Sequence, residues 1–327
     1  MLLKTYTCIL TVSVAICVFS VLYTTPAAAQ TFPTRPIRLV VPSAPGGGTD
    51  ILARVLANKL TEYLGQQVVV DNRAGAGTTI GIDNVAKAAP DGHTLLVSPS
   101  TLALNVWMYA KLPYDAMRDL APLTQIAAVP NALVVHPSVP ARSVADFVAL
   151  AKKQPGEINV GSAGIGTSPH LSLELLKHLA KINLVHVPYK GSGVATIANL
   201  AGEVSAQIPS LPTAMGYIRT NRLRALGVTT VKRSPFLPDV PAIGETVPGY
   251  EATQWFGFLT TAGTPQPVLD RLSQEGIRAL RAPDVAKHMA NEGAEIVATT
   301  PAQFAAYIKS ETEKWGRVIK AAGIKPQ

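Results

Sequence analysis

Cysteine is nearly absent from this chain, which has two in 327 residues. Both of them, Cys8 and Cys17, lie near the N-terminus. If that segment is removed on maturation, no cysteine remains, and disulfides and thiolate metal sites are excluded. Cysteine chemistry then plays no part in the mature protein.

The N-terminus itself has the composition of a secretory signal peptide. Lys4 precedes a mostly apolar run, Cys8–Tyr23, and Ala27-x-Ala29 matches a cleavage pattern. We therefore expect a signal peptide over residues 1–29 and export of the mature chain to the periplasm. An uncleaved N-terminal anchor is the alternative. Neither cysteine lies in a convincing lipobox.

Long apolar runs are missing from the rest of the chain. No later segment has the roughly 18 consecutive apolar residues that a membrane-spanning helix needs, so we expect a soluble mature protein. Removing residues 1–29 leaves 327 − 29 = 298 residues. This length favours two lobes, because a single core usually stops growing at roughly 250 to 300 residues.

Acidic residues are also scarce. The chain has 21 Asp and Glu against 29 Lys and Arg, a formal net charge of +8. A positive surface concentrates anionic solutes or favours contact with an anionic membrane surface. The basic residues are dispersed, with no Lys/Arg block and no stacked aromatic motif, so nucleic-acid binding is not expected.

The motifs of several enzyme classes are missing too. The chain has no Gly-x-Ser-x-Gly elbow for a nucleophilic serine. The triple glycine Gly46–Gly48 lacks the Gly-Lys-Ser/Thr of a phosphate-binding loop, and Gly75-x-Gly77 lacks the third glycine of the dinucleotide fingerprint. His170, His178 and His186 are eight residues apart, which is not the spacing of a His-x-x-x-His metal pair. We expect no cofactor, no metal and no covalent catalysis.

What the sequence does have is two glycine-rich turns, Pro42–Asp50 and Gly161–His170, each after an apolar strand pattern and each opening an amphipathic helix. A helix start has backbone N–H groups without intrahelical acceptors and about half a positive charge from aligned peptide dipoles. Such a turn can bind an anion. A lone turn of this kind is better explained by a tight connection that touches no ligand. Two of them predict an anion held between two lobes.

The order of the apolar patterns predicts an α/β fold. In each half, strands alternate with helices, which predicts a parallel sheet with helices on both faces. The strands are expected at residues 37–41, 68–70 and 94–97 in the first half, and at 158–160, 183–187, 204–208 and 225–228 in the second.

The C-terminal part predicts two long helices, because Thr264-Pro265 and Thr300-Pro301 each combine a cap with a first-turn proline. Apolar stretches at 123–135 and 252–261 can cross from one lobe to the other, and we place the hinge there. We therefore divide the mature chain into a discontinuous lobe 1, residues 30–130 and 253–327, and a lobe 2, residues 131–252.

The two turns supply the candidate binding residues. Four or five charge-assisted hydrogen bonds of about 1.5 to 3 kcal/mol each reach micromolar affinity after ordering costs, without any Lys or Arg.

Trp255 is either a pocket wall or hinge packing, and Lys190 is either a pocket cation or a solvated loop charge. The candidates are Ser43, Ala44, Gly46, Gly47, Gly48 and Thr49 with Thr78 and Thr79 on one wall; Ser162, Gly166, Thr167 and His170 on the other; and Ser100, Ser192, Ser210 and Trp255 beside them.

Four motifs together resemble one family. They are Pro33-Thr34-Arg35-Pro36-Ile37-Arg38, Pro45-Gly46-Gly47-Gly48-Thr49-Asp50, Asn-Val-Gly-Ser-Ala-Gly-x-Gly-Thr from Asn159 to Thr167, and His186-Val187-Pro188-Tyr189-Lys190-Gly191. From about Phe32 to Ile324 the chain resembles the Bug-type (TctC-like) extracytoplasmic solute-binding proteins of tripartite tricarboxylate transporters. The resemblance implies a type II periplasmic binding protein, with two α/β lobes joined by two crossing segments. It also implies that residues 43–49 and 162–167 seat a small carboxylate.

The resemblance further implies a monomer that delivers the carboxylate to two integral membrane transporter subunits and is not an enzyme. Two departures matter. This chain has Ser43-Ala44 where the family often has a bulkier or aromatic residue, and Pro209-Ser210 where many members have an acid followed by a polar residue. Loss of the acid disfavours an ammonium group on the ligand and favours a plain mono- or dicarboxylate, aromatic ones included. A sensor subunit that presents its ligand-bound form to a membrane receptor, and an enzyme using the same cleft, are the alternatives.

Overall fold

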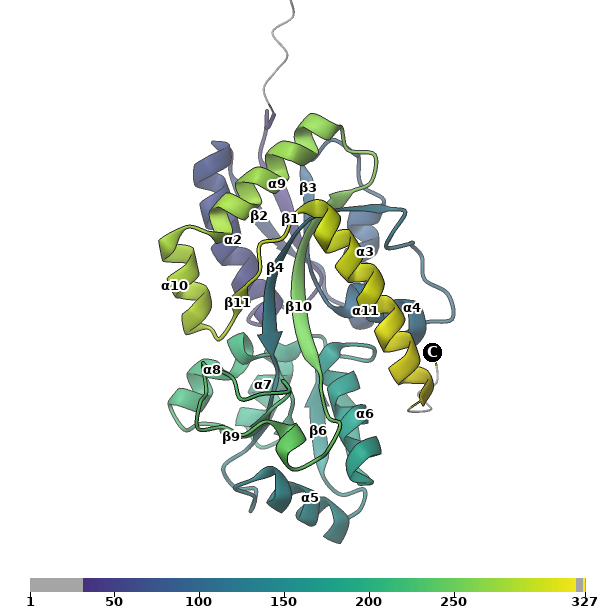
Figure 1. The fold of residues 1–327 in the computed structure, drawn as a ribbon, viewed down its shortest axis with the longest axis vertical. Helices are drawn as coiled ribbons and strands as arrows, with labels where there is room; N and C mark the ends of the chain where they lie inside the picture. The colour runs from purple at the N-terminus through teal and green to yellow at the C-terminus, as the bar shows by residue number, and fades with distance from the viewer. Residues whose placement is uncertain (1–31, 322–325, 327) are drawn as a thin grey trace, which may run out of the picture. The chain divides into compact units, whose positions relative to one another are not determined.

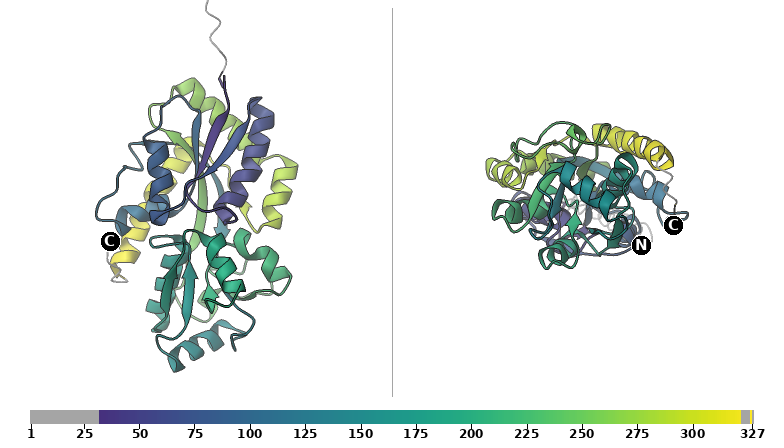
Figure 2. Two further views of the ribbon diagram at one scale, coloured as in Figure 1. Left: turned by 180° about the vertical axis from the view of Figure 1, so that it is seen from behind. Right: turned by 90° about the horizontal axis from the view of Figure 1, so that it is seen from below.

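The computed structural model describes residues 32–321 and 326, so the expected signal peptide and both cysteines lie outside the described residues. Residues 35–327 form one compact unit. This unit contains two β-sheets, and helices pack around both of them in Figures 1 and 2. Within residues 32–321, no helix combines the length and apolarity of a membrane span.

The first sheet has six strands. β1 is parallel to both β2 and β3. α2 (Gly48–Leu64) connects β1 to β2 and ends at Gly65, whose φ of 68° is the left-handed conformation that favours glycine after a helix. α3 (Thr79–Ala86) connects β2 to β3. In spatial order the strands are β11 (Glu295–Ile296), β4 (Leu120–Pro130), β10 (Thr253–Thr261), β3 (Thr94–Pro99), β1 (Ile37–Val41) and β2 (Val68–Asn72).

The three strands predicted in the first half are parallel, as expected, but β4, β10 and β11 add antiparallel pairs, so the sheet as a whole is mixed. β10 lies antiparallel between β3 and β4. The reason is the path of the chain, because β4 leads toward the second sheet and β10 leads back, so the two neighbours run in opposite directions. Figure 1 shows this strand pair extending from the first sheet toward the second. The two segments predicted to cross between lobes therefore do so.

The second sheet has five strands. β6 is parallel to β7 and β8, while β5 is antiparallel to β8 and β9. Only Asn131 separates β4 from β5, so one nearly continuous segment contributes to both sheets. In spatial order the strands are β7 (Val185–Pro188), β6 (Asn159–Ser162), β8 (Ala206–Gln207), β5 (Ala132–Val135) and β9 (Arg224–Val228).

Most of the other helices follow the ends of strands. The two long helices expected in the C-terminal part, over residues 266–282 and 302–321, are α9 and α11. α10 was not predicted, and it begins at Pro283, because proline cannot continue a helix but can begin one. The remaining helical elements are η1 (Ala76–Thr78), α4 (Thr101–Met108), α5 (Val144–Lys153), α6 (Ser168–Ala180), α7 (Ser192–Leu200), α8 (Leu211–Arg219), η2 (Ile243–Glu245), α9 (Gln266–Leu280), α10 (Pro283–Asn291) and α11 (Pro301–Ala321).

Each sheet has its own apolar core, and we call the two parts the first lobe (six-stranded sheet) and the second lobe (five-stranded sheet). A third buried cluster joins them, because Leu171 of α6 in the second lobe packs with Trp315 and Ile319 of α11. The first core includes Val40, Leu96, Leu259 and Phe304, and the second includes Leu133, Phe147, Val160 and Leu226.

Candidate functional site

A cavity of about 250 Å³ lies between the two lobes. Its walls include the first residues or N-caps of α2, α4, α6, α7 and α8, together with the turn η1. The lining residues are Pro42, Ser43, Gly47, Gly48, Thr49, Gly75, Ala76, Gly77, Thr78, Pro99, Thr101, Tyr109, Ala163, Gly164, Ile165, Thr167, Ser168, Pro169, Pro188, Tyr189, Lys190, Gly191, Ser192, Ser210 and Gln254.

These helix starts have no side-chain cap from their own N-cap residues. The N-cap side chains of α2, α4, α6, α7 and α8 make no capping hydrogen bond, and in α2 the Gly48 N–H donates to Thr213 Oγ1. α5 differs, because Ser143 Oγ accepts a hydrogen bond from Asp146 N–H at 3.0 Å. An uncapped helix start retains donors and a positive dipole end, both of which favour a negatively charged ligand group.

Asp50 holds the glycine turn of the first lobe. Its carboxylate accepts hydrogen bonds from Gly46 N–H, Arg54 Nε and Asn72 Nδ2, each at 3.0 Å. Burial alone would raise the pKa of this carboxyl group, but the hydrogen bonds and the Arg54 charge lower it below its usual value. Asn72 Nδ2 also donates to the Ser43 carbonyl oxygen at 3.0 Å. An ionised carboxylate outside the cavity therefore fixes the turn that begins α2.

A left-handed turn completes the first wall. Ala76, Gly77 and Thr78 have φ values of 44°, 56° and 81°, a region that is strained for the two residues with a Cβ. Asn105 Nδ2 donates to the Gly77 carbonyl oxygen at 3.1 Å, and Thr78 Oγ1 lies 2.7 Å from Thr101 Oγ1. These bonds hold two hydroxyl groups at the cavity.

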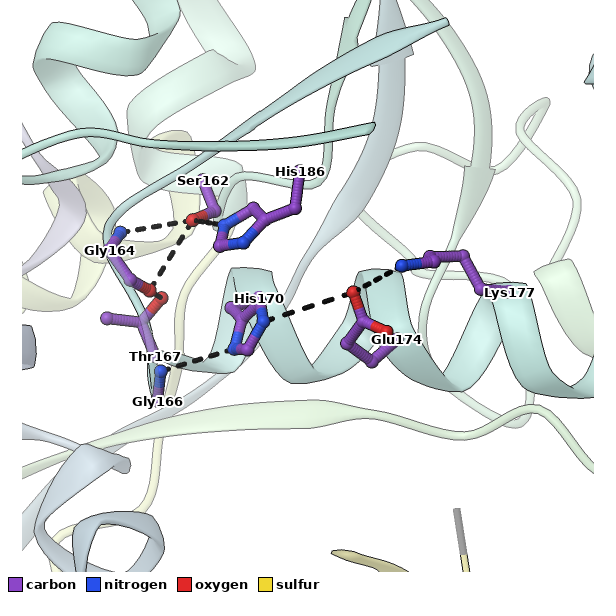
Figure 3. A network of polar contacts seen from close by, with 8 residues as sticks. All are labelled: Ser162, Gly164, Gly166, Thr167, His170, Glu174, Lys177 and His186. Atoms are coloured by element: carbon purple, nitrogen blue, oxygen red, sulfur yellow. Dashed lines mark hydrogen bonds and ion pairs between the residues drawn. The ribbon is translucent and has the colours of Figure 1, made fainter. Parts of the chain in front are cut away.

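The second wall is the loop from Ser162 to Thr167 and the start of α6 (Figure 3). Thr167 Oγ1 donates to the Gly164 carbonyl oxygen at 2.6 Å, and Gly164 N–H donates to Ser162 Oγ at 3.1 Å. Gly164 and Gly166 have φ values of +120° and +77°, which only glycine adopts without strain. The loop has a fixed shape whose glycines are required by its backbone.

The two lobes touch around the cavity. Ala44 N–H donates to the Lys190 carbonyl oxygen at 3.3 Å, and Gly48 N–H donates to Thr213 Oγ1 at 2.8 Å. A Cβ on Gly193 would lie only 2.9 Å from the Pro45 carbonyl oxygen. The starts of α2 and α7 therefore face each other at short range. Their positive dipole ends repel unless an anion lies near both.

Half of the predicted binding residues line this cavity. They are Ser43, Gly47, Gly48, Thr49, Thr78, Thr167, Ser192 and Ser210. Lys190 also lines the cavity, and it is the only charged residue among the described residues of the lining.

The other predicted residues lie behind the walls, where their polar groups support the turns. Gly46 and Gly166 use their N–H groups inside the protein, Thr79 Oγ1 accepts from Asn105, Ser162 Oγ binds within its own loop, and Ala44 contacts the other lobe. Ser100 is 1% exposed at the start of α4, and His170 packs behind the second-lobe loop.

Trp255 lies in the first core and is not among the described residues that line the cavity. The side chain is fully buried. Its ring lies 5.6 Å from that of Phe304 and 5.8 Å from that of Tyr307, both on α11, measured between ring centres. Neighbouring residues of a strand face opposite sides, so Gln254 faces the cavity instead.

Gln254 is the main polar residue of the cavity lining that the sequence analysis missed. Its side chain is 6% exposed, and Oε1 has no hydrogen-bond partner among the described residues. Tyr109 and Tyr189 also line the cavity without having been predicted. The Pro188-Tyr189-Lys190-Gly191 motif was the available signal for Tyr189, whereas nothing near Tyr109 in the sequence distinguished it.

Comparison with known proteins identifies the family. The model of the tripartite tricarboxylate transporter family receptor, TctC, matches residues 52–324. The chain belongs to this family. BugT of Bordetella pertussis is 39% identical over 305 residues, which cover 92% of this chain and 93% of BugT.

Solved structures of similar proteins agree with this TctC assignment. R. palustris Rpa4515 with adipate is 36% identical, with a TM-score of 0.88 over 90% of this chain and 100% of that one. MatC from Rhodopseudomonas palustris with bound malate is 31% identical, with a TM-score of 0.83 over 88% of this chain and 100% of MatC. The periplasmic binding protein BugD is 32% identical, with a TM-score of 0.88 over 90% of this chain and 100% of BugD. The predictions of a two-lobe α/β binding protein of this family, and not an enzyme, are confirmed.

Proposed function

We propose that this protein is a periplasmic receptor that captures a small carboxylate by closing its two lobes around it. The observation that carries the proposal is the set of uncapped helix starts, contributed by both lobes, around one cavity. A ligand that bonds to both walls stabilises only the closed form, and a ligand that touches one wall does not shift the equilibrium between open and closed forms.

The cavity fits a short carboxylate in size and in donors. Its volume of about 250 Å³ is below the usual range for drug-sized ligands, roughly 300 to 1,000 Å³. Adipate and malate, which Rpa4515 and MatC hold, are small aliphatic dicarboxylates and are the natural first probes. Lys190 offers a charge for a second anionic group.

The ligand is a plain mono- or dicarboxylate rather than an amino acid, with or without an aromatic ring. No Asp or Glu is among the described residues that line the cavity, so an ammonium group would find no charged partner there. Pro209-Ser210 replaces the acid that many relatives were expected to carry at this point. Ser210 lines the cavity, and its Oγ lies 3.2 Å from Thr213 Oγ1.

We place the hinge at 130/131 and 252/253, which gives lobe 1 as residues 30–130 and 253–327 and lobe 2 as residues 131–252. Thr253 pairs with Pro130 at the end of the two crossing strands, which supports these positions. The receptor acts as a monomer after cleavage of a signal peptide, residues 1–29, and delivers its ligand to two integral membrane transporter subunits. The membership in the TctC family supports this partner assignment.

Calorimetry with adipate and with malate tests the site. Gly47→Leu places a side chain in the cavity, and Thr167→Val removes the hydroxyl that bonds to the Gly164 carbonyl oxygen. We expect each variant to bind the better of the two ligands at least about tenfold more weakly, because the leucine side chain occupies space in the cavity and the valine leaves the second-wall loop without the bond that fixes its shape. Unchanged affinity in both variants would refute the assigned walls.

A further inference from the structure

Two histidines of the second lobe stack behind the loop that forms the second wall. The rings of His170, on α6, and His186, on β7, lie 4.2 Å apart between centres with an angle of 26° between their planes. Neither residue lines the cavity. Figure 3 shows both rings directed toward the Ser162–Thr167 loop. The pair therefore contacts the loop rather than the ligand.

Each ring makes one hydrogen bond to this loop. Gly166 N–H donates to His170 Nδ1 at 3.2 Å, and Ser162 Oγ lies 2.5 Å from His186 Nε2. Ser162 Oγ in turn accepts from Gly164 N–H. Gly164, Ile165 and Thr167, which line the cavity, are thus held from behind by the two imidazoles.

The bond to Gly166 fixes the protonation state of His170. A nitrogen that accepts from a backbone N–H carries no proton, so His170 is neutral with its proton on Nε2. The groups that face the pair are Glu174, whose Oε1 lies 3.9 Å from His170 Nε2, and Lys177, which forms an ion pair with Glu174 at 2.8 Å. Glu174 is therefore partly neutralised and offers the pair little support for a positive charge.

Burial also favours the neutral rings. It lowers the pKa of His170 to about 4, with a further contribution from Lys177, and lowers the pKa of His186 to about 4, with a further contribution from His170. The pair is neutral at pH 7 and gains protons only in acid.

We infer that His170 and His186 are positioning residues of the carboxylate site, whose neutral, stacked form holds the Ser162–Thr167 loop and whose protonation weakens carboxylate binding. This inference rests on the proposed function. A protonated His170 has two donors and loses its bond to Gly166, so the loop and the amides beside it shift. Binding then requires the proton-free form, and affinity falls as the pH drops through about 4, the value of both rings in the folded protein.

Two variants of His170 separate a hydrogen-bonding role from a packing role. His170→Asn places Oδ1 near the position of Nδ1 and keeps an acceptor, whereas His170→Leu keeps an apolar volume and has no acceptor. At pH 7.5 we expect adipate affinity to fall at least about tenfold in the leucine variant and less than about threefold in the asparagine variant. Equal losses, or the smaller loss in the leucine variant, would overturn the inference. His178→Asn, on the exposed face of the same helix, is the matched control.

The pH profile tests the protonation step. Adipate affinity is measured from pH 7.5 to about 3.5 for the wild type and for the double variant His170→Asn/His186→Gln, which has no titrating ring here. Adipate itself takes up protons in this range, but it does so equally with both proteins. We expect the wild type to lose about tenfold more affinity than the double variant toward low pH. Parallel profiles, or a wild type that binds relatively more tightly in acid because a charged ring attracts the anion, would contradict the inference.

Amide hydrogen exchange at Gly166 gives a readout that needs no ligand. We expect exchange to be faster in His170→Leu than in the wild type and in His170→Asn, and to accelerate in the wild type below about pH 5 after correction for the intrinsic pH dependence of exchange. If neither adipate nor malate binds the wild type at pH 7.5, the carboxylate proposal fails. The exchange rates then still decide whether the histidine pair positions the loop.

Discussion

Asp50 shows how a single residue outside the cavity controls the shape of the site. It is 4% exposed, and its carboxylate joins the glycine turn, α2 and β2 through Gly46, Arg54 and Asn72. Because the charge is satisfied by these partners, it does not compete with a ligand for the donors at the cavity.

Asp50→Asn removes this charge and nearly keeps the size. We expect the free energy of unfolding at pH 7 to fall by about 1 to 3 kcal/mol, because hydrogen bonds to a charged acceptor become neutral ones. The folded-state pKa of Asp50 is lowered, so its stabilisation is fully present above the ordinary value of 3.8 and is lost as the pH falls through the lowered value.

Urea unfolding of the wild type and Asp50→Asn at pH 7 and at about pH 2.5 measures both effects, and the two proteins should differ less in acid. Asp284→Asn, which removes an exposed ion pair with Lys59, is the control and should change little. Equal stability of Asp50→Asn and the wild type at pH 7 would argue against the role given to Asp50.

Gln254 and Trp255 are neighbours with opposite roles, and their substitution should separate binding from stability. Gln254→Leu keeps the size but removes the amide that faces the cavity, so we expect adipate affinity to fall about tenfold with the midpoint of thermal unfolding preserved. Trp255→Ala removes a fully buried ring and should lower the free energy of unfolding by about 3 to 5 kcal/mol. Calorimetry and thermal unfolding of both variants check this, and unchanged affinity in Gln254→Leu would exclude the amide from the site.

The same pair of residues marks a limit of sequence analysis. The apolar run at 252–261 was predicted only to cross between the lobes, and it forms the strand β10. Both faces of this strand are buried, so the pattern does not alternate between apolar and polar residues. Without alternation, the face that meets the cavity is decided by packing against α11, which the sequence does not show. The tryptophan was the more conspicuous residue, and the glutamine beside it lines the site.

Among helices and strands, the decisive feature is the close approach of helix starts from opposite lobes. Gly193, in the first turn of α7, lies against Pro45 and Gly46, which precede α2. Its φ is not in the left-handed region, so this glycine is required by the contact and not by its own backbone. A glycine at the site can therefore be needed for the close approach of the two lobes, and not only for anion binding.

Gly193→Ala tests this distinction. A Cβ there would lie 2.8 Å from the Gly46 carbonyl carbon and 2.9 Å from the Pro45 carbonyl oxygen. If the lobes separate when the ligand leaves, as we propose, this overlap affects only the closed form. We expect adipate affinity to fall at least about tenfold, since such overlap costs about 1 to 3 kcal/mol, while the ligand-free protein keeps its thermal stability.

The matched control for this variant is Gly216→Ala, on the exposed face of α8, where a Cβ has open space. It should raise the free energy of unfolding by about 0.5 to 1 kcal/mol and leave the affinity unchanged. Full affinity in Gly193→Ala would show that closure does not need this contact.

Helix starts and strands were largely predictable from the sequence, because glycine turns, prolines and apolar runs act locally. The helix expected to open in the Pro42–Asp50 turn begins at Gly48. The helix expected to open in the Gly161–His170 turn begins at Ser168, with Pro169 in its first turn. Which starts face each other was not predictable. The arrangement of the two lobes decides that α7 contacts α2 and that η1 contacts the loop at Ile165.

For the molecule as a whole, two crossing strands and one buried cluster link the lobes. β4 and β10 pair along their length, and Leu171 of the second lobe packs with Trp315 of α11. The repeated strand and helix order predicted the two-lobe fold. It did not predict the mixed first sheet, because that depends on the C-terminal part of the chain returning to the first lobe.

A crystal structure of the protein grown with adipate tests the central claim most directly. We predict that one carboxylate lies in the cavity and accepts hydrogen bonds, directly or through one water, from N–H or hydroxyl groups of both the 43–49 turn and the 162–168 loop. A carboxylate bound outside the cavity, or one held by a single lobe while the other stands away from it, would contradict the account.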